Sequence, residues 1–150
     1  MSLDVRRATG ADAPRIAELS AVLGYPVDAA EMRERLARLL AREADAVFVA
    51  AAADRVVGWI HCADHELLET GRHCEILGLV VDAGHRRGGV GRRLVTAVED
   101  WACARGITVI AVRSNVVRPE SHPFYERIGY ARVKTQHSYR KIAPEAPCAD

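Results

Sequence analysis

The chain has 150 residues, of which 49% are hydrophobic, and this length and apolar content suit a single domain over residues 1–150. Its 21 lysines and arginines balance 20 acidic residues, which excludes a strong overall attraction to nucleic acid or to a membrane surface. No apolar run approaches the roughly 20 residues that span a bilayer. We therefore expect a cytoplasmic protein with no nucleic-acid and no membrane partner.

The four cysteines stand far apart, and no cysteine and histidine cluster has the spacing of a zinc site. They are Cys62, Cys74, Cys103 and Cys148. We expect reduced thiols, which agrees with a cytoplasmic location, and no metal.

The first half of the chain predicts a strand, two helices and a pair of strands. The expected ranges are a strand around 3–5, a helix through 14–23, a helix over 28–44, and strands over 46–52 and 55–62. Asp28 and Glu31 resemble a capping box at the start of the second helix. Asp54 and Arg55 predict a tight hairpin turn between the two strands.

The second half predicts further strands and helices in alternation. The expected elements are a polar loop over 64–72, a strand over 75–81, a long helix that ends at Gly106, a strand over 107–112, a loop over 114–119, a short helix over 121–128 closed by Gly129, a strand through 133–139 and a flexible tail over 143–150. Helices interspersed with strands, including a hairpin, indicate an α/β fold: a mixed sheet with helices on both faces.

A glycine-rich loop, residues 86–92, joins a buried strand to the start of the long helix. The first N–H groups of a helix have no partner inside it, so they attract anions. Glycines at 88, 89 and 91 let a ligand approach the backbone, and the arginines add positive charge. A solvated glycine-rich turn is the alternative. The loop lacks the Gly-Lys-Ser/Thr ending of a P-loop and the G-x-G-x-x-G pattern of dinucleotide-binding folds.

Two motifs carry a family resemblance. Arg86-x-x-Gly89-x-Gly91, which follows the strand, resembles motif A of the GNAT superfamily, the Gcn5-related N-acetyltransferases. The segment 124–130, Phe-Tyr-Glu-Arg-Ile-Gly-Tyr, resembles the F-Y-E-x-x-G-[FY] segment of the same superfamily. The resemblance covers essentially residues 3 to 141. It implies a mixed, mostly antiparallel sheet in which two strands splay apart, with acetyl-CoA (coenzyme A as its product) as the co-substrate.

The same resemblance implies which residues contact coenzyme A. Backbone amides of the glycine-rich loop would hold the pyrophosphate, and the strand before it would bond the pantetheine arm in the gap between the splayed strands. Asn115 would bond that arm through its side-chain amide, or it is an ordinary turn residue. The expected contacts are Leu79, Val80, Val81, Arg86, Arg87, Gly88, Gly89, Val90, Gly91, Arg92 and Asn115. A longer loop over 116–123 departs from the usual pattern of the family.

The resemblance also implies a general acid and a general base. Tyr125 matches the tyrosine that protonates the departing thiolate, although it could instead pack the short helix against the sheet. Glu75 lies on the cofactor strand, and strand alternation predicts that it shares a face with Val81. It would accept the proton of the acceptor amine, directly or through water. A surface ion pair is the alternative for Glu75.

The expected activity is transfer of an acetyl group to a primary amine of a small molecule or peptide, by direct attack in a ternary complex. Weaker candidates for acceptor contacts are Tyr25, His61, His65 and Glu66. Two other functions stay open: a non-catalytic acyl-CoA-binding regulatory module, and an acetyltransferase of protein lysines or amino termini. An exposed sheet edge or the final strand could support a homodimer.

Overall fold

The computed structural model describes residues 2–113 and 121–145. The chain forms two compact units, Met1–Arg113 and Ser114–Asp150. The first unit contains a five-stranded sheet and three α-helices, and residues 121–145 of the second contain one short helix. In the described part of the chain, no helix combines the length and the apolar character needed to cross a membrane.

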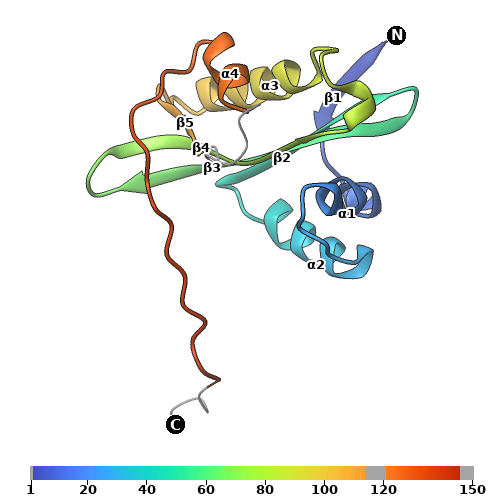
Figure 1. Ribbon diagram of the computed structural model, residues 1–150, viewed down its shortest axis with the longest axis horizontal. Coiled ribbons are helices and arrows are strands. Elements are labelled where there is room, and N and C mark those ends of the chain that lie inside the picture. The colour runs from blue at the N-terminus through green and yellow to red at the C-terminus, as the bar shows by residue number, and fades with distance from the viewer. Residues whose placement is uncertain (1, 114–120, 146–150) are drawn as a thin grey trace. The chain divides into compact units, whose positions relative to one another are not determined.

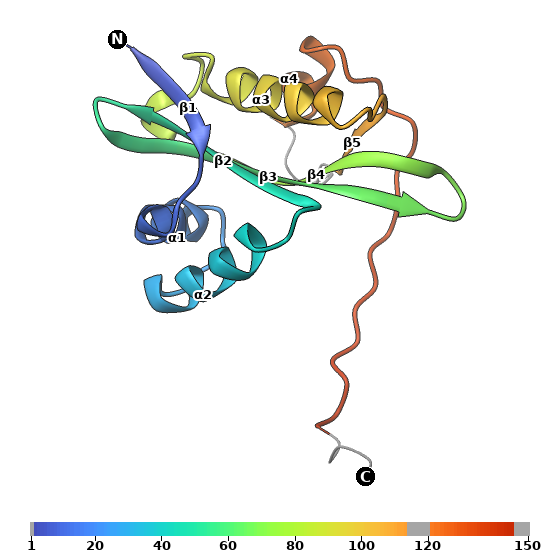
Figure 2. The ribbon, with the colours of Figure 1, turned by 180° about the vertical axis from the view of Figure 1, so that it is seen from behind.

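The sheet of the first unit is mixed and mostly antiparallel, as the family resemblance implied. The elements are β1 (Leu3–Arg7), α1 (Ala13–Val22), α2 (Ala29–Leu40), β2 (Asp45–Ala52), β3 (Arg55–Leu67), β4 (Gly71–Val81), α3 (Val90–Ala104) and β5 (Ile110–Val112). The strands lie in the order β1-β2-β3-β4-β5, and only the β4–β5 pair is parallel. Helices α1 and α2 cover one face and α3 covers the other (Figures 1 and 2).

Each face of the sheet has its own apolar core, which is why the helices show an amphipathic pattern. On the first face, Ile16 and Leu19 of α1 and Leu36 of α2 pack with Val47 and Val49 of β2. On the other face, α3 buries one apolar stripe at helical spacing. That stripe consists of Val90, Leu94, Val95, Val98 and Ala102. The two cores hold the sheet between helical layers.

Both predicted glycine closures of helices are confirmed. Gly106 follows α3 with a φ of +77°, and Gly129 follows α4 (Ser121–Arg127) with a φ of +99°. Residues without glycine's freedom rarely adopt such a left-handed conformation, which is common just after a helix. The predicted extent of the second helix is wrong, because α2 ends at Leu40 and a turn leads into β2 at Asp45.

The predicted turn at Asp54 and Arg55 is displaced by one residue. Ala53 and Asp54 form the turn, with φ values of +50° and +63°, and Arg55 already pairs with Ala52. Two successive left-handed residues are typical of the type I′ turn, whose twist matches that of the flanking strands. The turn is therefore Ala53–Asp54.

The polar loop predicted over 64–72 is a β-hairpin. Strand β3 runs on to Leu67 and β4 begins at Gly71, with pairs from Asp64↔Cys74 to Leu67↔Gly71. The residues around its tip, 66–70, are exposed. Toward its tip the two-stranded ribbon is solvated on both sides and carries no apolar alternation, so its composition resembles that of a loop.

The strand predicted through 133–139 is absent from the structure, in which residues 131–145 form neither strand nor helix. Val133 and Tyr139 are 87% and 90% exposed. Alternating residues make a strand only where a partner takes up the backbone N–H and C=O groups. Of the predicted tail, residues 143–145 are exposed, and 146–150 lie outside the described residues.

Candidate functional site

Strand β4 extends well past its parallel neighbour. β5 pairs only with the segment from Cys74 to Ile76. Beyond Ile76, no described residue of the first unit pairs with this edge of β4. Leu79, Val80 and Val81 lie on that free stretch, where a sheet edge presents N–H and C=O groups to an extended ligand.

A β-bulge separates the paired and unpaired parts of β4. His61 pairs with Gly78 and Cys62 pairs with Ile76, so Leu77 is an extra residue with no counterpart on β3. A bulge bends its strand and increases its twist. The bend occurs where β4 and β5 part, which supports the splayed arrangement that the resemblance implied.

The bulge also overturns the prediction that Glu75 and Val81 share a face. Glu75 pairs with Ala63, and Val81 pairs with Gly58. Ala63 and Gly58 point to opposite faces, because they are an odd number of positions apart on a stretch of β3 that has no bulge. Each residue of β4 shares the face of its partner, so Glu75 and Val81 also point to opposite faces. Glu75 therefore shares the face of Trp59, which packs on the α1–α2 core. Val81 points to the α3 face. The extra residue breaks the alternation on which the prediction relied.

The loop that leads to α3 is anchored at its first residue. Asp82 accepts a hydrogen bond from the backbone N–H of Gly84 at 3.3 Å, and from Arg15 of α1 at 2.8 Å. The Gly84 hydrogen bond and the Arg15 guanidinium together lower the pKa of Asp82, so the carboxylate stays ionised at neutral pH. Arg15 also donates to the carbonyl of Val56 at 2.8 Å. These bonds fix the loop against α1 and β3.

The glycine-rich loop itself is open to solvent and has the backbone of an anion site. Residues 86–89 are exposed. Arg87 and Gly89 adopt left-handed conformations, with φ values of +71° and +82°. Left-handed residues within such a turn aim successive N–H groups into one concavity. Gly89 is the N-cap of α3, where no side-chain hydrogen bond caps the helix, so its first N–H groups remain available to a phosphate.

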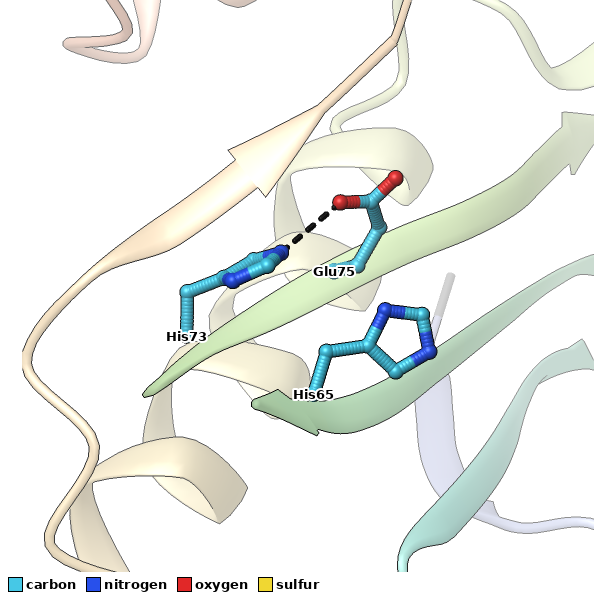
Figure 3. A group of neighbouring side chains, drawn as sticks. All are labelled: His65, His73 and Glu75. Atoms are coloured by element: carbon cyan, nitrogen blue, oxygen red, sulfur yellow. Dashed lines mark hydrogen bonds and ion pairs between the residues drawn. The ribbon is translucent and has the colours of Figure 1, made fainter. Parts of the chain in front are cut away.

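Three side chains from the β3–β4 hairpin meet on one face of the sheet (Figure 3). The His73 Nε2 lies 2.9 Å from Oε1 of Glu75, and both side chains are buried. The ring of His65 meets that of His73 edge-on, with centroids 5.8 Å apart. Arg113 places its Nε 3.4 Å from Oε2 of Glu75. The Glu75 carboxylate thus has a cation near one oxygen and an imidazole on the other.

A second histidine–carboxylate pair lies further along the same face. His61 Nε2 lies 2.7 Å from Oδ2 of Asp45, and only Ala63 separates His61 from His65 in the alternation of β3. Glu66 points to the opposite face and pairs across the hairpin with Arg72, so the structure does not bring it into this group. Tyr25 lies in the α1–α2 connection and is 63% exposed.

Two members of this face, His73 and Asp45, were not predicted from the sequence. The alternation of His61 with His65, and of His73 with Glu75, is the signal that could have found His73. The polar-loop interpretation of 64–72 hid this signal, because it left no reason to expect His65 opposite His73.

Tyr125 lies in α4 of the second unit. Its ring contacts those of Phe124 and Tyr130, with centroids 5.1 and 6.0 Å apart. Burial raises the pKa of the Tyr125 phenol to about 12, so it is protonated at neutral pH. Asn115 lies outside the described residues.

Comparison with known proteins identifies the family. The sequence pattern of the Acetyltransferase (GNAT) family matches residues 14–130. The aminoglycoside N(6')-acetyltransferase type 1 of Stenotrophomonas maltophilia is 32% identical over 135 residues, which make up 87% of this chain and 87% of that protein.

Solved structures agree on the fold. The aminoglycoside 6'-N-acetyltransferase AAC(6')-Ih of Acinetobacter baumannii superimposes with a TM-score of 0.83 at 15% identity, covering 95% of this chain and 100% of that one. AAC(6')-Iy in complex with a bisubstrate analogue of coenzyme A superimposes with a TM-score of 0.85 at 18% identity, again covering 95% and 100%. The chain therefore belongs to the GNAT family of acetyltransferases, which take the acetyl group from acetyl-CoA.

Proposed function

We propose that this enzyme acetylates a primary amino group of an aminoglycoside, at the 6' position, or of a closely similar polycationic amine. The observation that carries the proposal is the 32% identity, over 87% of both chains, to an aminoglycoside N(6')-acetyltransferase. Asp45 and Glu75 on one face of the sheet support it, because aminoglycosides carry several ammonium groups that carboxylates attract.

We propose that acetyl-CoA is held by the glycine-rich loop and by the free edge of β4. The N–H groups at the start of α3 and of residues 86–92 would bind the pyrophosphate, and the flanking arginines would add charge-assisted bonds. Leu79 and Val81 would bond the pantetheine arm through their backbone. The open space around Gly89, whose added Cβ would meet no atom within 4 Å, supports close approach of a phosphate.

Glu75 would act as the general base. It accepts a proton from the ammonium of the acceptor, directly or through a water molecule, and this frees the nitrogen lone pair for attack on the thioester carbonyl carbon. A backbone N–H of the 79–81 segment would stabilise the oxyanion of the tetrahedral intermediate. His73 and Arg113, which contact the two oxygens of Glu75, support a carboxylate held in one orientation.

Tyr125 would act as the general acid. When the tetrahedral intermediate collapses, the carbon–sulfur bond breaks and the phenol donates its proton to the departing thiolate. The pKa of about 12 means that this phenol carries its proton at every pH at which the enzyme would work. Asn115 is proposed as a further contact of the pantetheine arm, on the family pattern alone.

We propose that the enzyme works in the cytoplasm as a single domain. The free thiols of Cys62 and Cys74, buried on adjacent strands of the sheet, support a reducing compartment.

The test is release of free coenzyme A thiol from acetyl-CoA in the presence of single amines. The panel should contain aminoglycosides, linear polyamines, amino acids and lysine-containing peptides at equal concentration. The proposal expects the highest kcat/KM with an aminoglycoside. A higher kcat/KM with a peptide would contradict it and would favour a protein acetyltransferase, and no turnover with any amine would favour a binding module.

A further inference from the structure

We propose that His65, His73 and Glu75 form a binding site for one divalent transition-metal ion, with Zn²⁺ as the best match. Each residue offers one donor atom, and the three donor atoms all lie within 4.8 Å of one another. Two imidazoles and a carboxylate are a donor set that suits zinc and its neighbours in the first transition series. Figure 3 shows the three side chains gathered over the hairpin.

The spacing of the donors fits an ion of this size. Zinc binds nitrogen and carboxylate oxygen at about 2.0–2.2 Å, so two ligand atoms of a tetrahedral site lie about 3.4 Å apart. Nε2 of His73 and Oε1 of Glu75 are 2.9 Å apart, so they need to separate only slightly to admit the ion. The ion would replace the hydrogen bond between them, and the ring would keep its proton on Nδ1. His65 is half-buried and only has to turn its ring toward the pair.

The backbone holds the donors in place. His65 and His73 are direct cross-strand partners, and Glu75 follows His73 on the same face of β4. Arg113 contacts Oε2 of Glu75 and leaves Oε1 for the ion, which is the arrangement in which an outer group orients a ligating carboxylate. Three protein ligands leave a coordination position open, as in zinc sites that bind water or substrate.

Other residues nearby are of types that bind metals in many proteins, but they are not part of this site. Cys74 lies between His73 and Glu75 in sequence, so its thiol points to the opposite face of the sheet, as does that of Cys62. Asp45 and His61 form a second pair, but it offers only two donors.

The site has a consequence for catalysis that rests on the proposed function. Glu75 cannot bind a metal ion through Oε1 and also act freely as the base for the amine. Zinc is therefore expected to inhibit acetyl transfer, and a chelator is expected to restore it. Metal binding itself does not depend on that role of Glu75.

Calorimetric titration of the full chain with zinc chloride, without acetyl-CoA or an amine, tests the proposal. We expect one equivalent to bind, and we expect His65→Ala and His73→Asn each to weaken binding by at least about tenfold, since even outer-shell changes at metal sites have effects of this size. His61→Ala is the matched control, because it removes a histidine from the same strand and face. Circular dichroism would confirm that each variant is folded.

The proposal is contradicted if the wild-type chain binds no zinc, or if folded His65→Ala binds it as tightly as the wild type. It is also contradicted if the complex with Co²⁺ shows the charge-transfer absorption of thiolate ligands. Because no acyl transfer is measured, a failure here is distinct from a failure of the proposed activity.

Discussion

Glu75 is held by His73 through a contact of 2.9 Å between two buried side chains on one strand. Since a bulge at Leu77 follows, this pair shares the α1–α2 face of the sheet with Asp45 and His61 rather than the α3 face. The contact orients the Glu75 carboxylate on that face, as His61 orients the carboxylate of Asp45.

We predict that Glu75→Gln lowers kcat/KM by about 10²-fold or more, the usual size of a general-base contribution. The loss should be greatest at lower pH, where more of the acceptor amine is protonated and needs a base. The measurement is a pH–rate profile for both enzymes. Glu69→Gln, an exposed change at the tip of the same hairpin, is the control. An unaltered profile in Glu75→Gln would remove Glu75 from the mechanism.

We predict that Tyr125→Phe lowers the rate of the chemical step by about 10²–10⁴-fold and barely changes acetyl-CoA affinity, because the ring remains. Tyr139→Phe, at a tyrosine that is 90% exposed, is the matched control. Single-turnover measurements separate chemistry from product release. Turnover of Tyr125→Phe within about threefold of the wild type would show that the phenol is only structural.

The raised pKa of Tyr125 gives a separate pH prediction. Because the acid form is the active one and its pKa is about 12 rather than 10, deprotonation of Tyr125 should cause no loss of rate between pH 8 and about 10. The loss should begin only as the pH approaches 12. An alkaline limb near pH 10 in the wild type that disappears in Tyr125→Phe would contradict this.

For the glycine-rich loop, we predict that Gly89→Asp weakens acetyl-CoA binding by at least about tenfold, while Gly89→Asn has a much smaller effect. Both side chains have similar bulk, both tolerate the left-handed conformation at φ +82°, and both are good N-caps. The pair therefore isolates negative charge at the start of α3. Calorimetry measures both affinities, and equal affinities would show that no phosphate lies near Gly89.

Packing at the bulge gives a prediction about stability. A Cβ at Gly78 would lie 2.8 Å from the Trp59 ring, whereas a Cβ at Gly10 would meet nothing within 4 Å. Gly78→Ala should lower the free energy of unfolding by about 1–3 kcal/mol, as overpacking usually does, and Gly10→Ala should not. Urea denaturation followed by the fluorescence of Trp59, in a Trp101→Phe background, measures both. Equal stability of the two variants would contradict the contact.

Local sequence signals predicted much of the fold. Three confirmed features depend only on neighbours in sequence: the glycines after the helices, the helical spacing of Leu94, Val95 and Val98, and the cap at Asp28, whose carboxylate accepts a hydrogen bond from the N–H of Glu31. The position of the glycine-rich loop just before a helix could be predicted for the same reason, since its composition is also a local signal.

The remaining features depend on pairing between distant segments. Because Leu77 is an extra residue, the residues before it on β4 point to the opposite face from the one that simple alternation from Val81 predicts. Only the pairing of β4 with β3 reveals this change. His65 meets His73 only because residues 64–72 belong to a β-hairpin, and the polar composition of this segment predicts a loop instead. The strand expected through 133–139 had the right alternation, but alternation does not supply a partner strand.

The proposed activity is transfer of the acetyl group of acetyl-CoA to the 6'-amino group of an aminoglycoside. The most direct measurement is mass spectrometry of the product formed from an aminoglycoside with a free 6'-amino group, beside a matched compound that has a hydroxyl group at that position. We predict one acetyl group, on the 6'-nitrogen of the first compound, and no enzymatic product from the second. Equal acetylation of both compounds, or of neither while a lysine peptide is acetylated, would contradict the proposed activity.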